Sequence, residues 1–151
     1  MKNFKRDFVK RTIEILDKNY ENTEYEVTLL LNCLLGMVSL PIEDKKSSKD
    51  NNVVQFENDC VQELKQLSIK FQSNDSTNQL FRNIRNSICH LHIEPSAYQG
   101  YIENIHFKNF SNGNKGKLTF WVIISVENLR EFANYVAKEY LSRFFGVNSD
   151  T

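Results

Sequence analysis

The residues whose types and spacing could do chemistry lie together in one stretch, "RNIRNSICHLH", residues 82–92. This stretch concentrates two arginines, two asparagines, a cysteine and two histidines in eleven positions. Arginine stays charged and can hold phosphate oxygens through two parallel hydrogen bonds, and histidine can transfer protons near neutral pH. The stretch therefore suits chemistry at a phosphate group.

The elements around this stretch predict which of its side chains are accessible. Helical spacing, a cap at Asp75 or Ser76 and the breaker Pro95 predict a helix whose last turn ends near Leu91. Four apolar residues share one face of that helix and should face the core: Phe81, Ile84, Ile88 and Leu91. Three polar residues form a row on another face, open to solvent or to a second subunit: Arg82, Asn86 and His90.

The order Arg85, Asn86, three further residues and His90 resembles the R-x4-H motif of the HEPN superfamily, in which a polar residue directly follows the arginine. The resemblance extends to an early "TLLLNCLLGMVSLP" helix, a hairpin containing "TFWV" and a final "LREFANYVAKEYL" helix, so it covers most of the chain. The chain looks like a small HEPN subfamily found on plasmids and in mobile regions of prokaryotic genomes. This implies a mainly α fold, an antiparallel bundle of four to five helices with a β-hairpin before the last helix.

The resemblance also implies an activity, which is metal-independent endoribonuclease cleavage through attack by a ribose 2′-hydroxyl. Arg85, Asn86 and His90 would be the catalytic residues, with Arg82 as a candidate for phosphate binding or for the dimer interface. No metal or cofactor is expected. One helix supplies a single histidine of this kind, so the resemblance implies a composite site across a homodimer. A role in toxin–antitoxin or anti-phage defence follows, with a nucleotidyltransferase-like antitoxin as a candidate partner.

A second function remains open, because some HEPN domains are inactive dimerisation or nucleic-acid-binding modules. Each site residue also has a simpler interpretation. Arg85 and Asn86 could be solvated surface side chains, and His90 could simply interact with the helix macrodipole, an effect of about 0.3–1 kcal/mol.

The remaining reactive or aromatic residues favour structural roles. His92 follows the helix end and points away from His90 in helical register, and His106 lies in a predicted strand. Cys89 lacks the paired base that a nucleophile needs. Trp121 could stack on a base, but the predicted strand continues into "VIIS", which favours packing of Trp121 in the core. The segment "SNGNKG" lacks the order of a phosphate-binding loop and is predicted to be a turn.

The rest of the chain supplies the scaffold for the predicted helix. We expect three helices in the first half of the chain. The first covers residues 3–20, the second runs from a capping box at Thr23 and Glu26 to Pro41, and the third covers 57–72. Residues 42–54 should form a polar loop. Strands at 101–110 and 117–126 should form the hairpin, and Ser125 and Gly146 should bound the last helix.

Composition sets the limits of the prediction. With 151 residues, one domain over 1–146 and a frayed tail at 147–151 are expected. Nineteen basic and nineteen acidic side chains exclude a protein that coats nucleic acid through global charge. Three separated cysteines indicate free thiols. The absence of an apolar leader, and an apolar stretch too short to span a bilayer, predict a cytoplasmic protein.

Overall fold

The computed structural model describes residues 2–18, 24–47, 51–74, 79–111 and 116–146. Within these residues the chain forms five helices and four strands. Their order is α1 (Lys2–Leu16), α2 (Glu24–Ser47), α3 (Asn51–Leu67), β1 (Lys70–Ser73), α4 (Leu80–Cys89), β2 (Ile93–Tyr98), β3 (Tyr101–Phe110), β4 (Leu118–Ser125) and α5 (Val126–Phe145). The mainly α fold is confirmed.

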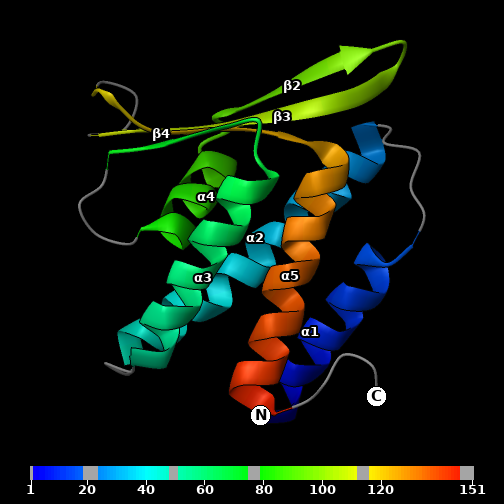
Figure 1. Cartoon of the computed structure of the whole chain (residues 1–151). Helices are drawn as coiled ribbons and strands as arrows, with labels where there is room; N and C mark the ends of the chain where they lie inside the picture. The colour runs from blue at the N-terminus through cyan, green and yellow to red at the C-terminus, as the bar shows by residue number, and fades with distance from the viewer. Residues whose placement is uncertain (1, 19–23, 48–50, 75–78, 112–115, 147–151) are drawn as a thin grey trace.

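The predicted hairpin is part of a larger sheet. β3 and β4 pair as expected, with Phe107 opposite Val122, but β2 and β1 extend the sheet on either side. The strand order is β1-β4-β3-β2 and all neighbours are antiparallel. Figure 1 shows the helices gathered on one side of this sheet, so only its inner face contributes to the core.

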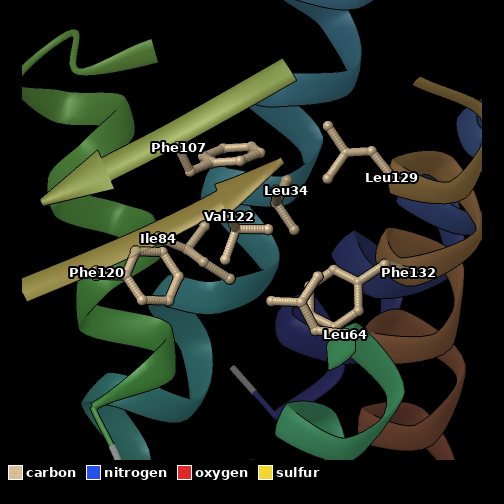
Figure 2. A pocket seen from close by; sticks show the side chains of 8 residues that line it. All are labelled: Leu34, Leu64, Ile84, Phe107, Phe120, Val122, Leu129 and Phe132. Atoms are coloured by element: carbon tan, nitrogen blue, oxygen red, sulfur yellow. The ribbon is translucent and has the colours of Figure 1, made fainter. Parts of the chain in front are cut away.

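The core lies where the helices meet the inner face of the sheet. Eight apolar side chains from α2, α3, α4, α5, β3 and β4 converge there (Figure 2). They are Leu34, Leu64, Ile84, Phe107, Phe120, Val122, Leu129 and Phe132. They enclose a space of about 10 Å³, which is about enough for one water molecule, but the lining offers no polar partner. We therefore interpret this space as a packing gap and not as a ligand site.

The last helix, α5, is the element that the sequence predicted best. Ser125 accepts a hydrogen bond from the Asn128 backbone N–H at 3.1 Å, which confirms it as the N-cap. Gly146 adopts a left-handed conformation with φ of 64° and ends the helix, as predicted. Between these bounds, Leu129, Phe132 and Val136 recur at helical spacing and are buried.

The prediction that α2 ends at Pro41 is wrong, because the helix continues to Ser47. The predicted loop at 42–54 is also wrong over most of its length, since α3 begins at Asn51. Tertiary contacts hold the extra turn in place. Asp44 accepts a hydrogen bond from the Tyr140 hydroxyl and pairs with Lys5 at 3.2 Å. Burial, followed by this hydrogen bond, raises the pKa of the Tyr140 hydroxyl.

The longer α2 also corrects the expectation that the apolar stretch is too short to span a bilayer. Between Tyr25 and Asp44 the helix is long and apolar enough to do so by length and composition alone. In the structure, 44% of the window is buried inside the protein. Its buried residues Leu34, Met37 and Val38 belong to the main core, so α2 serves here as a core helix.

Three further boundaries differ from the prediction. The first helix ends at Leu16, and α3 ends at Leu67, so Phe71 lies in β1 and not on a helix face. Pro95 lies within β2, six residues after Cys89, where α4 ends. The predicted caps Thr23, Asp75 and Ser76 and the tail 147–151 lie outside the described residues.

Trp121 does not pack in the core, contrary to the prediction. Its neighbours Phe120 and Val122 are buried, so strand alternation turns Trp121 to the outer face of the sheet, where it is half-buried. The Lys70 ammonium lies 3.5 Å from its ring centroid and the Lys108 ammonium lies 5.4 Å from it. The outer face therefore presents an aromatic ring flanked by cations.

A buried carboxylate supports the start of the site helix. Glu57 of α3 is only 3% exposed and accepts a hydrogen bond from the Phe81 backbone N–H at 3.2 Å. The N-cap residue Gln79 makes no side-chain cap, so Glu57 satisfies this N–H from a neighbouring helix and faces the positive end of the α4 dipole.

We expect Glu57→Ala to lower the free energy of unfolding by about 1–3 kcal/mol, because the Phe81 N–H loses its partner in a buried place. Urea unfolding followed by circular dichroism measures this. The control is Gln62→Ala, at an exposed position of the same helix, which should change the stability by less than about 0.5 kcal/mol. Equal stability of the two variants would contradict the role assigned to Glu57.

Candidate functional site

The polar side of α4 faces outward, as the sequence predicted. Three of the four predicted core residues are buried: Phe81, Ile84 and Ile88. Along the opposite side, three residues are exposed and two are half-buried: Arg82, Cys89 and His90, then Arg85 and Asn86. The helix thus displays all four predicted site residues on one accessible side.

Two buried polar side chains, which the sequence reasoning did not assign to the core, attach α4 to β3. The Ser87 hydroxyl is fully buried and lies 2.7 Å from the Lys108 carbonyl oxygen and 2.8 Å from the Asn83 carbonyl oxygen. Asn83 is also buried, and its side-chain oxygen accepts a hydrogen bond from Asn109 at 2.9 Å. These hydrogen bonds fix the rotation of α4 and so determine which residues point outward.

The outward side of α4 is electropositive. The Arg85 guanidinium donates a hydrogen bond to the Asn86 side-chain oxygen at 3.3 Å, which orients the two groups together. The helix contains two arginines and no acidic residue. Within the part of the chain that the structure describes, neither Arg82 nor Arg85 forms an ion pair. Two guanidiniums that meet no carboxylate among the described residues suit the binding of an anion.

The end of α4 departs from the prediction at Leu91. This residue was expected to face the core, but it is 83% exposed. The helix ends at Cys89, with His90 as the C-cap, and Leu91 takes a left-handed conformation with φ of 56°. The chain turns there and enters β2, so the helical register no longer applies beyond His90.

His92 does not lie where helical register placed it. It was expected to point away from His90, but the two ring centroids lie 6.0 Å apart with an interplanar angle of 34°. The sequence "HLH" carries no local signal for this arrangement, because it depends on the left-handed turn at Leu91.

The cysteines are free thiols, as predicted. Burial raises the pKa of the Cys33 and Cys60 thiols, which keeps both protonated. Cys89 is exposed beside the site. Among the described residues, no group of three or more histidine, cysteine or acidic side chains is placed to hold a metal ion.

The comparisons with known proteins identify the family of this chain. A family model described as HEPN pEK499 p136 matches residues 1–145, almost the whole chain. No curated protein and no solved structure matches the chain significantly. The match includes the helix that carries Arg85, Asn86 and His90 as well as the sheet that holds it. The chain therefore belongs to the HEPN pEK499 p136 family, a plasmid-associated family of the HEPN superfamily.

Proposed function

We propose that this protein is a metal-independent endoribonuclease whose site is the outward side of α4. Membership of a HEPN family associates the chain with nucleases and other RNA-related modules. The observation that carries the finer proposal is the display of Arg85, Asn86 and His90 on one accessible side of α4, with no carboxylate on that helix to neutralise the arginine.

These residue types match the steps of the reaction. A base takes the proton from a ribose 2′-hydroxyl, and the 2′-oxygen attacks the adjacent phosphorus. Arg85 holds the phosphate oxygens and stabilises the added negative charge, and Asn86 orients Arg85 through the hydrogen bond between them. A protonated histidine gives its proton to the 5′-oxygen as that bond breaks. The products are a 2′,3′-cyclic phosphate and a 5′-hydroxyl.

We propose further that the protein acts as a homodimer, in which a two-fold axis brings two α4 surfaces together. Arg82 lies one turn before Asn86 on the exposed side and is accessible to a second subunit or to a phosphate. The HEPN resemblance extends this to a toxin or defence role in the cytoplasm, with a nucleotidyltransferase-like antitoxin as the candidate partner.

The test is cleavage of RNA by the pure protein in excess EDTA. We expect fragments that carry 2′,3′-cyclic phosphate and 5′-hydroxyl ends, identified by mass spectrometry. An RNA with 2′-deoxy residues at the cleaved positions should resist, because it lacks the attacking hydroxyl. Fragments with 5′-phosphate ends, or equal cleavage of the 2′-deoxy substrate, would exclude this mechanism.

A second candidate function, binding of nucleic acid without cleavage, is favoured by the outer face of the sheet. Trp121 lies there between Lys70 and Lys108, which suits stacking of a base with the backbone phosphates on the lysines. Trp121 is the only tryptophan in the chain, so its fluorescence reports such stacking directly. Quenching by single-stranded RNA, in a wild-type protein that cuts no RNA, would favour this second function.

A further inference from the structure

Two imidazoles meet at the junction between α4 and the sheet. His90 closes α4 through its backbone N–H, which donates to the Asn86 carbonyl at 2.9 Å. His92 is held by its own backbone. Its N–H donates to the Ser87 carbonyl at 2.8 Å, and its carbonyl accepts from the Lys108 N–H at 3.0 Å. These hydrogen bonds anchor the His92 backbone to both α4 and β3, and the His92 ring centroid lies 6.0 Å from that of His90.

The His92 ring is also oriented. It packs edge-on against Phe110, with ring centroids 5.2 Å apart and an interplanar angle of 86°. Its Nδ1 atom is buried and has no hydrogen-bond partner among the described residues. A buried polar atom without a partner costs free energy, and so does the left-handed conformation of the exposed Leu91 that makes the turn. Both costs occur at the turn that brings the two imidazoles together.

We propose that His92 is the second proton-transfer group of the site, paired with His90 within one protomer. This inference rests on the proposed ribonuclease function and changes one part of it. A dimer can still shape the site, but it is not needed to supply a second imidazole. The two rings are separated by about the span of one phosphodiester, and Arg85 and Asn86 lie on the same side of α4 as His90.

These two imidazoles can accept and donate all the protons that the reaction transfers. One imidazole takes the proton of the 2′-hydroxyl, and the 2′-oxygen forms a bond to phosphorus. The bond between phosphorus and the 5′-oxygen breaks, and that oxygen receives a proton from the other, protonated imidazole. One proton is taken up and one is released, no electrons are exchanged, and hydrolysis of the cyclic phosphate is not required.

Three variants separate proton transfer from packing. His92→Ala should lower kcat for RNA cleavage by at least about 100-fold, with a change in KM of only a few-fold. His92→Phe keeps an aromatic ring against Phe110 and should be equally inactive. The matched control is His106→Ala, at the half-buried third histidine in β3, which should cleave at the wild-type rate. Thermal unfolding of all three variants shows whether the fold is retained.

A modified substrate shows which histidine acts as the base and which as the acid. An RNA in which sulfur replaces the bridging 5′-oxygen releases a thiolate, which needs no protonation. If the two histidines act as base and acid, one of the variants His90→Ala and His92→Ala should recover most of its activity on this substrate and the other should not. Recovery by neither variant would overturn the pairing. If His92→Phe cleaves ordinary RNA as the wild type does, the pairing is likewise overturned and His92 has only a packing role.

A binding measurement distinguishes failure of this inference from failure of the proposed function. NMR of the histidine rings is recorded while uridine 3′-monophosphate, which resembles the product, is added. We expect the signals of His90 and His92 to move together and those of His106 to stay. If the wild type cleaves RNA but only His90 responds, the inference fails and the ribonuclease proposal stands. If the wild type does not cleave and neither ring responds, both fail.

Discussion

Arg85→Ala should lower kcat for RNA cleavage in EDTA by about 100- to 1000-fold, the effect of losing one preorganised group that stabilises charge in the transition state. The fold should be unaffected, because the Arg85 side chain hydrogen-bonds only to the adjacent Asn86 among the residues that the structure describes. Arg85→Lys should restore little, since an ammonium keeps the charge but cannot hold two phosphate oxygens at once. Cleavage of labelled RNA, with far-UV circular dichroism of each variant, measures both effects.

His90→Ala should lower kcat by about 100- to 10,000-fold, because it removes a proton-transfer group and not a charge that holds the substrate. The matched control for both variants is Arg11→Ala, which removes an exposed cation from α1, away from the site helix. It should cleave normally. Activity close to wild type in both Arg85→Ala and His90→Ala would refute the proposed site even if the protein proved to be a ribonuclease.

Phe81→Ala should lower the free energy of unfolding by about 3–5 kcal/mol, the range for removing a buried phenylalanine ring. Phe81 is 2% exposed, and its ring centroid lies 5.5 Å from that of Phe56 in α3. Phe56 in turn contacts the rings of Tyr140 and Phe144 in α5. The substitution therefore opens a cavity where three helices meet, and urea unfolding should show a clearly lower midpoint.

Arg82→Ala is the control for this variant, because Arg82 follows Phe81 in the chain but points to solvent. It should change the stability by less than about 0.5 kcal/mol. It should also weaken binding of RNA at low salt if Arg82 contacts a phosphate. A loss of stability from Arg82→Ala as large as that from Phe81→Ala would mean that the two sides of α4 have been assigned incorrectly.

The sequence alone was sufficient wherever a pattern is local. The alternation of apolar and polar residues along α4 correctly separated buried Phe81, Ile84 and Ile88 from exposed Arg82 and His90. Ser125 and Gly146 correctly bounded α5, because capping depends on the conformation of a few neighbouring residues. The motif Arg85-Asn86…His90 identified the superfamily, which the match to residues 1–145 then confirmed.

Only the tertiary structure decided the features that depend on partners far away in the chain. β1 has four residues and exists because Phe71 pairs opposite Val122 of β4, so no local period could reveal it. The last turns of α2 persist beyond Pro41, where Asp44 bonds to Tyr140, a residue ninety-six positions later. The outward position of Trp121 follows from which face of the sheet the helices cover.

The position of His92 shows the same division most clearly. The sequence has two histidines near the end of α4, and an ideal helix that continued to His92 would place them on opposite sides. Their approach depends on where α4 ends, on the left-handed turn at Leu91 and on the hydrogen bonds that carry His92 into the sheet beside Lys108. Local sequence determined which side chains are available for chemistry. Long-range hydrogen bonding and packing decided which of them meet, because contacts between distant segments outweigh the weak conformational preferences of a few residues at a helix end.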